Sequence, residues 1–361
     1  MLENIYKGKV VLVTGHTGFK GSWLSIWLSL LGAKVVGISL GALDYPSNYE
    51  VSGVSKFIKE YYVDIRDRVK VSQIVQQHQP DFVFHLAAQS LVLASYESPV
   101  DTIETNLVGT VNILESLRML EKDVVSIMIT SDKVYANVGW VWGYRETDKL
   151  GGKDPYSASK GMAELAIHSY VKSFFSFENT NVKVGITRAG NVIGGGDWAV
   201  DRIVPDCMKS WSQNKIVEIR NPNATRPWQH VLDPLYGYLV LGEKLTKSPD
   251  FHGEAYNFGP EAHHNYSVCD LIEYMSRTWK NIRWEDASKN QEYLYESSLL
   301  KLSTDKALSD LGWKPMLQFE DTVRMTVEWY KLYYSNKCSS MYEFTIGQIK
   351  EYENINLAKG A

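Results

Sequence analysis

The sequence predicts an α/β protein with a Rossmann-type, doubly wound parallel sheet and a smaller, mixed C-terminal domain for the substrate. Two observations predict this fold. Short β-rich runs alternate with longer amphipathic runs through the first half of the chain, and a glycine-rich loop joins the first strand to the first helix. Such alternation is typical of a parallel sheet with helices on both faces. The length of 361 residues allows two domains.

The predicted strands and helices of the first half follow one another in order. Strands are predicted over residues 9–14, 34–39, 60–63, 81–86, 124–130 and 182–187, and helices over residues 19–31, 66–77, 99–120 and 155–175. The strand runs are short and rich in β-branched or aromatic residues, whereas the helix runs are longer and amphipathic. This order predicts a parallel sheet.

Beyond about Gly190 the regular alternation ends at stretches rich in glycine, asparagine and proline. Helices are predicted over residues 236–245, 271–278 and 322–334, and the first of these could return to the Rossmann side. We assign residues 1–189, with about 228–256, to the Rossmann domain. Residues 190–227 and 257–361 are assigned to the smaller, substrate-binding domain.

The composition narrows the possible partners. The net charge is −4 and no block of like charges occurs, which argues against nucleic acid or an anionic membrane as a partner. The longest apolar stretch, about residues 23–31, is too short to span a membrane, and there is no signal core, so we expect a cytoplasmic protein. The cysteines, Cys207, Cys269 and Cys338, are far apart, and His263-His264 has no third ligand at a suitable spacing. We therefore expect no metal site and no disulfide framework.

The loop after the first strand predicts a dinucleotide cofactor. Its glycines have the spacing G-x-x-G-x-x-G, and its residues are Gly15, His16, Thr17, Gly18, Phe19, Lys20 and Gly21. Glycine allows the tight turn and lets the backbone approach a pyrophosphate, which then meets free N–H groups at the start of the helix. The strand before the loop and the helix after it are the context that this motif requires.

The adenosine end of the cofactor site is less well defined. An acid that binds the ribose usually ends the second strand, but residues 37–40 contain none, and Asp44 lies further on in a loop. No arginine replaces the acid, which weakens the case for NADP but leaves the choice between NAD and NADP open. Asp64 and Ile65, after the third strand, suit an adenine contact. Asp64 could instead cap the helix that follows.

Tyr156 and Lys160 form the predicted hydride-transfer pair. They are four residues apart in a predicted helix and so lie on one face. A phenol with a pKa of about 10 is a poor base at neutral pH, but the lysine and nicotinamide charges would lower that pKa. Tyr156 can then take the proton of a hydroxyl group while hydride leaves the carbon. A hydroxyl at Thr130 or Ser131, where the preceding strand ends, can bond the substrate oxygen.

These segments are similar to the extended short-chain dehydrogenase/reductase superfamily, over nearly the whole chain. The similarity rests on the glycine loop, on HLAAQS (residues 85–90), on the hydroxyl that follows the fifth strand and on PYSASK (residues 155–160). The resemblance implies a catalytic triad of Ser131, Tyr156 and Lys160. It also implies that the nicotinamide half of the cofactor is bordered by Ala87, Ala88 and Gln89.

Asp132 and Lys133, directly after Ser131, indicate the reaction. Nucleotide-sugar 4,6-dehydratases have an acid pair here, whereas Asp-Lys resembles the branch of that group that acts on CDP-glucose, as do residues 15–23 and 224–231. The resemblance implies NAD as cofactor: hydride leaves C4 of the sugar, water is lost across C5 and C6, and hydride returns to C6. Asp132 would protonate O6. Lys133 stands where the C5 base is expected, and it either takes that proton or stabilises the enolate.

The second half of the chain carries candidates for binding a nucleotide sugar. Arg226 is the best candidate for a bidentate phosphate clamp, because its segment matches the family motif. The same resemblance implies that Asn191 contacts the substrate phosphates, that Arg202 lies near them and that Asn257 contacts the sugar nucleotide. The resemblance also implies a homodimer, in which each subunit contributes two helices, including that of Tyr156. The helix around residues 103–120 is apolar enough for this, although an intramolecular core would have the same pattern.

Three other functions fit parts of the pattern. A nucleotide-sugar 4-epimerase shares the cofactor loop and the Tyr-Lys pair, but it needs no acid and base at C5 and C6. A dinucleotide-binding sensor or scaffold would have no need of an intact triad. A reductase of small carbonyl compounds would not need the phosphate-binding features or the large second domain. The sequence therefore favours the dehydratase.

Overall fold

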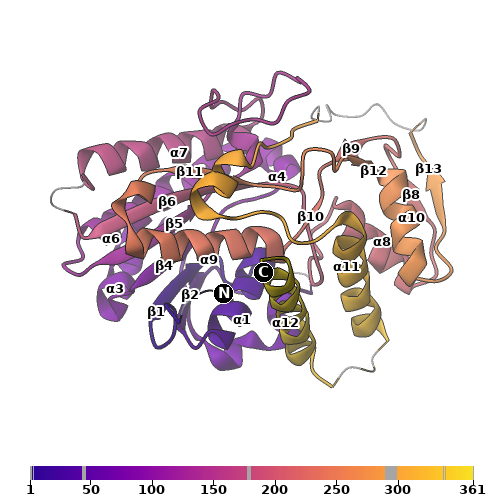
Figure 1. Ribbon diagram of the computed structural model, residues 1–361, viewed down its shortest axis with the longest axis horizontal. Coiled ribbons are helices and arrows are strands. Elements are labelled where there is room, and N and C mark those ends of the chain that lie inside the picture. The colour runs from indigo at the N-terminus through magenta and orange to yellow at the C-terminus, as the bar shows by residue number, and fades with distance from the viewer. Residues whose placement is uncertain are drawn as a thin grey trace.

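The computed structural model describes residues 2, 4–42, 46–176, 180–288, 299–335, 337 and 339–360. Asp44 and Cys338 lie outside the described residues. A parallel sheet has helices on both faces, and a smaller group of short strands and helices lies beside it (Figure 1). The predicted fold class is confirmed.

The main sheet is parallel, with the strand order β11-β6-β5-β4-β1-β2-β3. Its strands are β1 (Val10–Thr14), β2 (Lys34–Ser39), β3 (Lys59–Tyr62), β4 (Phe82–His85), β5 (Val124–Ile129), β6 (Val182–Ala189) and β11 (Ala255–Phe258). The strand order reverses between β1 and β4, which opens a crevice at the carboxyl ends of these strands. The six predicted strands are present, whereas β11 was not predicted.

Two groups of helices cover the sheet. On one face lie α3 (Arg68–His78), α6 (Gly109–Arg118) and α7 (Pro155–Ser173), and on the other lie α1 (Phe19–Leu30), α9 (Leu232–Lys247) and α12 (Met341–Gly360) (Figure 1). The first group packs aliphatic side chains such as Ile113 and Ile167 against the sheet. The second group adds aromatic side chains, including Trp23 and Trp27 of α1. Both faces of the sheet are therefore buried.

The helix predicted over residues 99–120 consists of three segments. α5 (Pro99–Ile103) continues into a π-helical turn, η2 (Glu104–Val108), and then into α6. The wide turn contains Asn106, whose amide donates to the carbonyl of Gln89 at 2.9 Å and to the hydroxyl of Ser159 at 2.8 Å. Asn106 thus connects the loop after β4 to helix α7. These two segments form walls of the crevice, and the bonds of Asn106 fix their relative position.

The smaller part is built from short elements. They are β7 (Val192–Ile193), α8 (Ile203–Ser212), β8 (Val217–Ile219), β9 (Thr225–Arg226), β10 (Gln229–His230), β12 (Tyr266–Ser267), α10 (Val268–Thr278), β13 (Trp284–Asp286) and α11 (Phe319–Tyr334). The strands pair as β7 with β10, β8 with β13 and β9 with β12. Helix α12 then returns to α1 and α2 (Asn48–Ser52). The domain division given above stays a prediction.

The apolar residues of α6 do not by themselves indicate a dimer. Ile113, Leu114 and Leu117 are buried in the core beneath the main sheet of the same chain. Val108 and Leu165, in the adjoining helical segments, are exposed. The homodimer therefore stays a prediction. Among the described residues, no helix has the length and apolar character needed to cross a membrane.

Candidate active site

A large cleft lies at the carboxyl ends of the central strands. Its volume is about 1260 Å³, above the roughly 300–1,000 Å³ typical of a pocket for one small ligand. The walls come from the β1–α1 loop, the ends of β2 to β5, the start of α7 and the segment from Ala189 to Trp228. A cleft of this size has room for a dinucleotide and a second ligand beside it.

The glycine loop lines the cleft with Gly15, Thr17, Gly18, Phe19, Lys20 and Gly21. Gly15 has a φ of 74°, and a Cβ there would lie 2.8 Å from the backbone nitrogen of Ala87, so only glycine fits this position. No side chain caps the N-terminus of α1. The first N–H groups of α1 therefore suit a pyrophosphate, as the sequence predicts.

His16 is the member of the loop that points away from the cleft. Its ring is buried against Gly37 of β2, and its Nε2 lies 3.0 Å from Oε1 of Glu60. Burial lowers the pKa of His16, and the bond to Glu60 opposes that shift. The side chain thus joins the β1–α1 loop to β2 and β3, and any cofactor contact at this position would come from the backbone.

At the adenosine end, Asp64 and Ile65 line the cleft together with Ser39. The Asp64 carboxylate accepts hydrogen bonds from the backbone nitrogen of Arg66 at 2.8 Å and from its Nη2 at 2.7 Å. The bond to the Arg66 side chain holds the pKa of Asp64 below its usual value. Helix α3 is capped by Asp67, which accepts from the backbone of Lys70 at 3.1 Å. The alternative that Asp64 caps this helix is therefore wrong, and its adenine contact stays a prediction.

Ala87 and Ala88 line the cleft after β4, whereas Gln89 is not among the described lining residues. The Gln89 amide donates to the hydroxyl of Thr102 at 2.8 Å, and its oxygen accepts from the backbone of Leu91 at 2.6 Å. In this conformation Gln89 shapes the loop that carries the two alanines, and it has no side-chain contact with the cleft.

Tyr156 and Lys160 lie on one face of α7 at the centre of the cleft. Helix α7 begins with Pro155, and the side chain of Asp154 accepts from the backbone of Ser157 at 2.9 Å. Both site residues are buried. Burial lowers the pKa of Lys160 to about 8, and the nearby charge of Lys20 acts in the same direction. Lys160 Nζ lies 3.5 Å from the carbonyl oxygen of Ile129, so it is held at the end of β5.

The phenol of Tyr156 is a weak acid in this environment. Burial is the largest cause, and it raises the pKa of Tyr156 to about 12; the charge of Asp132 adds to the rise. A hydrogen bond with Ser131 and the charge of Arg202 act in the opposite direction. A further positive charge in the cleft, such as that of an oxidised nicotinamide, would lower this pKa towards neutral values.

Ser131, Asp132 and Lys133 lie in one tight turn next to Tyr156. We call residues 131–134 the catalytic turn; its last three residues form a single 3-10 turn, η3 (Asp132–Val134). The Ser131 hydroxyl donates to Oδ1 of Asp132 at 2.9 Å and accepts from the backbone nitrogen of Lys133 at 3.2 Å. Ser131 and Asp132 are buried, Lys133 is half-buried, and all three line the cleft. Ser131 thus links Tyr156 to Asp132.

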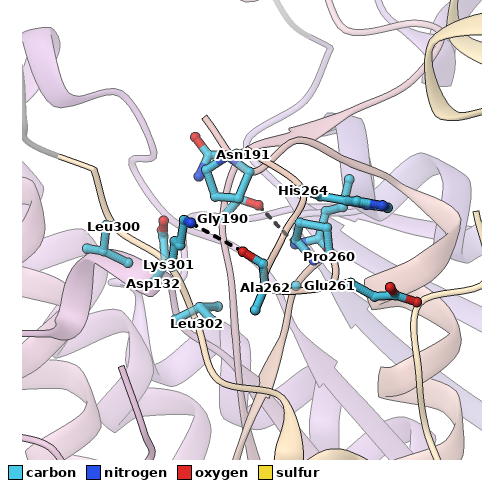
Figure 2. A pocket seen from close by; sticks show the side chains of 13 residues that line it. Asp132, Gly190, Asn191, Pro260, Glu261, Ala262, His264, Leu300, Lys301 and Leu302 are labelled. Carbon is cyan, nitrogen blue, oxygen red and sulfur yellow. Dashed lines mark hydrogen bonds between the residues drawn. The ribbon is translucent and has the colours of Figure 1, made fainter. Parts of the chain in front are cut away.

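A second, small cavity also borders Asp132 (Figure 2). Gly190 and Asn191 contribute to its walls, with parts of residues 259–264 and 300–302. A Cβ added at Gly190 would overlap the Asp132 carboxylate. The backbone at the end of β6 therefore lies directly against that carboxylate and restricts its position.

Three of the four predicted substrate-binding residues line the cleft: Asn191, Arg202 and Arg226. Arg202 Nη1 lies 2.5 Å from Oδ2 of Asp197, and Arg226 Nη1 donates to the carbonyl of Thr225 at 2.8 Å. Both guanidinium groups are thus at the cleft wall, where they can meet phosphates.

Asn257 lies apart from the other three, on β11 and fully buried. Its amide donates to the carbonyls of Tyr144 at 2.9 Å and Ser303 at 3.1 Å, and its oxygen accepts from the hydroxyl of Tyr135 at 2.8 Å. A contact between Asn257 and a nucleotide sugar would require these bonds to be exchanged.

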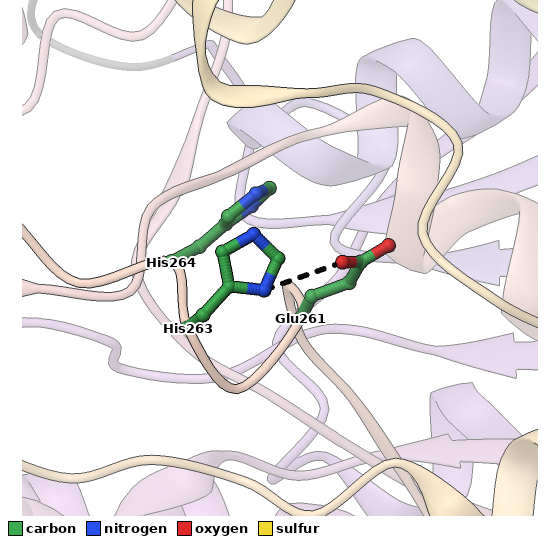
Figure 3. Close-up of side chains that lie close together, drawn as sticks. All are labelled: Glu261, His263 and His264. Atoms are coloured by element: carbon green, nitrogen blue, oxygen red, sulfur yellow. Dashed lines mark ion pairs between the residues drawn. The ribbon is translucent and has the colours of Figure 1, made fainter.

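The loop after β11 brings Glu261 next to His263 and His264 (Figure 3). One ligand atom from each residue lies within 4.8 Å of the others, and His263 Nδ1 is 3.4 Å from Oε2 of Glu261. Glu261 and His263 are exposed. Glu261 precedes His263 by two residues, and it was not recognised from the sequence as a possible third ligand. The expected absence of a metal stays a prediction.

The cleft also contains polar residues that the sequence did not single out, including Asp206 and Arg220. Burial, followed by the charge of Asp201, raises the pKa of Asp206 to about 6. Arg220 lies 3.3 Å from Oδ1 of Asp201. The sequence signal for Arg220 is weak, since only its place before Asn221-Pro222 sets it apart.

Comparison with known proteins agrees with this geometry. The family model described as GDP-mannose 4,6 dehydratase matches residues 12–326. A CDP-glucose 4,6-dehydratase of Salmonella typhimurium is 44% identical over 335 residues, which cover 91% of this chain and 92% of that protein. A dTDP-glucose 4,6-dehydratase of Shigella flexneri is 28% identical over 351 residues, with 89% and 92% covered.

Solved structures share the fold at lower identity. A UDP-glucose-4-epimerase from Stenotrophomonas maltophila, with bound NAD and formylated UDP-arabinopyranose, has a TM-score of 0.77 at 20% identity and covers 91% of this chain and 99% of that one. A UDP-glucose 4-epimerase from Brucella ovis in complex with NAD has a TM-score of 0.76 at 18% identity, with 90% and 98% covered. From the match of the family model and the identity to the Salmonella enzyme, the chain belongs to the GDP-mannose 4,6 dehydratase family.

Proposed function

We propose that this chain converts CDP-glucose to CDP-4-dehydro-6-deoxyglucose and water, with NAD as its cofactor. One observation carries the proposal: Asp132 and Lys133 adjoin Ser131, Tyr156 and Lys160 at a single cleft. The identity of 44% to the Salmonella CDP-glucose 4,6-dehydratase supports the choice of nucleotide.

The residues of the cofactor side fit a dinucleotide. The Gly15 turn leaves no space for a side chain, the start of α1 has no side-chain cap, and Asp64 and Ile65 line the far end. NAD, when bound, accepts a hydride from C4 of the sugar and returns it to C6. Lys160 would hold the nicotinamide ribose with its ammonium group, and its charge would favour the phenolate of Tyr156.

The catalytic residues divide the proton transfers between them. Tyr156 takes the proton of the 4-hydroxyl group, whose oxygen is bonded by Ser131. The resulting ketone acidifies the C5 proton, which leaves with help from Lys133 as the C6–O bond breaks. Asp132 gives a proton to O6, so that water departs, and a proton then returns to C5. The proton taken from O4 has a short path back to Asp132 through the Ser131 hydroxyl, 2.9 Å from Oδ1.

The substrate assay tests the function directly. The protein is incubated with NAD⁺ and with CDP-glucose, dTDP-glucose or GDP-mannose, and the 4-keto-6-deoxy product is measured. We expect product from CDP-glucose without stoichiometric NADH, because the hydride returns to the same sugar. An absence of product from all three sugars would overturn the dehydratase proposal, and a C4 epimer in its place would indicate the epimerase alternative.

Replacing Gly190 by Ala should impair dehydration because the new methyl group displaces the Asp132 carboxylate. Misplacing a catalytic group by 1 Å can lower a rate by about 100-fold, and overpacking typically costs about 1–3 kcal/mol of stability. Product formation and thermal unfolding are measured in parallel. Gly347→Ala is the control, since its new Cβ would meet no atom of the described residues within 4 Å apart from its chain neighbours and the backbone of its own helix. Full dehydration by the Gly190 variant would show that this contact does not position Asp132.

Removing metal ions should leave the reaction unchanged. The proposed chemistry uses protein groups and NAD, and the Glu261–His263–His264 cluster has two exposed members on a loop. The measurement is the rate of product formation after dialysis against EDTA, compared with the untreated protein. A loss of activity that Zn²⁺ restores would contradict the prediction.

A further inference from the structure

A buried ion pair between Glu164 and Arg188 lies behind the catalytic turn. The side chains are 0% and 1% exposed. Arg188 Nε donates to Oε2 of Glu164 at 3.1 Å, and its Nη2 also bonds Oε1 of the same carboxylate. Neither residue is among the described residues that line the cleft. Any effect of the pair on the reaction is therefore transmitted through its neighbours.

Glu164 is placed by α7 and Arg188 by β6. Glu164 is one helical turn beyond Lys160, so it shares a face with Tyr156 and Lys160. Arg188 is the penultimate residue of β6, the strand next to β5. The pair thus connects the helix that carries the hydride-transfer residues to the strand beside the catalytic turn.

The two members of the pair hold opposite ends of the catalytic turn. The residue before the turn is Thr130, whose hydroxyl donates to Oε2 of Glu164 at 3.0 Å. The residue after the turn is Tyr135, whose hydroxyl accepts from Nη1 of Arg188 at 2.6 Å. That hydroxyl in turn donates to Asn257 of β11. The ends of the turn are therefore fixed to one rigid group.

An ion pair is a costly way to fill this space, because buried charges lose their hydration and apolar side chains of similar volume would often be as stable. Apolar side chains, however, form no directional hydrogen bonds. The planar guanidinium group can bond a carboxylate with two nitrogens and still donate in a third direction. Here Nη1 of Arg188 donates to the hydroxyl of Tyr135 and, at 3.1 Å, to the carbonyl of Glu146.

Tyr156 and Lys160 have supports of their own. The backbone nitrogen of Tyr156 donates to the hydroxyl of Ser95 at 3.2 Å, and Ser159 accepts from Asn106 at 2.8 Å. Helix α7 also has its own cap at Asp154. Loosening the far end of the catalytic turn would therefore displace Asp132 and Lys133 more than it displaces the hydride-transfer pair.

We propose that the Glu164–Arg188 pair, acting through Thr130 and Tyr135, is a positioning device that sets Asp132 and Lys133 for water elimination. The proposal rests on the proposed dehydratase function. Its consequence is that weakening this device uncouples the reaction: oxidation at C4 continues, while elimination across C5 and C6 becomes slow.

Two variants weaken the positioning device without leaving a buried charge unpaired. Tyr135→Phe removes only the hydroxyl group that Arg188 bonds. Arg188→Lys keeps the charge near Glu164 but cannot bond Glu164 with two nitrogens and Tyr135 with a third. Tyr144→Phe is the matched control, because its ring stacks on that of Tyr135 but its hydroxyl bonds the loop at Val138 and Asn137.

The readout is the partition between oxidation and elimination with CDP-glucose and NAD⁺. NADH absorbance and 4-keto-glucose report oxidation, and 4-keto-6-deoxy product reports completion. We expect Tyr135→Phe and Arg188→Lys to lower product formation by about 10- to 100-fold, with NADH accumulating. Tyr144→Phe should keep the partition of the unmodified protein.

Three outcomes would overturn the proposal: an unchanged partition in both variants, an equal fall of oxidation and elimination, or the same uncoupling in Tyr144→Phe. An equal fall would mark the pair as a general structural support, and thermal unfolding would show the accompanying loss of stability. If the unmodified chain does not oxidise CDP-glucose at all, the proposed function fails instead, so the two failures are distinguishable.

Discussion

Tyr156→Phe should lower kcat/KM for CDP-glucose by about 10²- to 10⁴-fold, the usual contribution of a general base. The substitution keeps the buried ring and removes only the hydroxyl group, so the fold should be preserved. Because oxidation at C4 comes first, the variant should form neither NADH nor product. Single-turnover measurement of NADH absorbance, with product analysis of the same samples, tests this expectation.

The pH dependence supplies an independent test of Tyr156. The side chain must lose its proton to act as a base, so kcat/KM should rise with pH until the pKa of Tyr156 is passed. Burial sets that pKa at about 12 in the ligand-free chain, and the positive charge of bound NAD⁺ should lower it. The rise should therefore level off well below pH 12 and should be missing in Tyr156→Phe.

A second tyrosine on the same helix provides the control. Tyr170 lies further along α7, and its hydroxyl donates to Glu115 at 3.0 Å, away from the cleft. Tyr170→Phe should keep both the rate and the pH profile. Retention of substantial oxidation by Tyr156→Phe would show that another group removes the proton of the 4-hydroxyl, and the assignment of the base would then be wrong.

The central sheet was predictable because each of its first six strands is a short β-rich run next to a turn or a helix signal. Strand β11 (Ala255–Phe258) was missed because it lies beyond the regular strand–helix alternation of the first half and follows an irregular stretch. Helix α12 was missed for another reason: its apolar residues, such as Ile349 and Tyr352, are interspersed with polar ones and form no clear stripe. Both elements gain their stability from tertiary packing, which local patterns do not encode.

The candidate site was predictable where its residues are contiguous. The segment from Ser131 to Lys133 and the Tyr156–Lys160 spacing are local, so the sequence brings them to one place. Packing sets the direction of a side chain within a loop, and the sequence does not show that direction. The sequence therefore predicted cofactor contacts for His16 and Gln89, whose side chains turn away from the cleft. The bond between Glu164 and Arg188 joins two separate elements, and no local pattern predicts it.

Lys133→Ala should lower the rate of net dehydration by about 10²- to 10⁴-fold, whereas the rate of hydride transfer to the cofactor should be preserved. The side chain lines the cleft beside Asp132, and the substitution keeps the backbone nitrogen of Lys133 that donates to the Ser131 hydroxyl. NADH and 4-keto-glucose should therefore accumulate. Lys209→Ala, at an exposed position on α8, is the control and should be unaffected. Dehydration at the full rate by Lys133→Ala would refute the role assigned to this lysine.

Chemical rescue of Lys133→Ala distinguishes the two ways in which the lysine could act. A small primary amine can take the C5 proton in its neutral form, so rescue that grows with the neutral fraction of the amine would identify a base. Guanidinium keeps its charge across the working pH range and cannot take a proton, so rescue by guanidinium would identify electrostatic stabilisation of the enolate. Rescue of either kind must appear in product formation and leave the rate of NADH formation unchanged, because the ketone at C4 is already made when the C5 proton leaves.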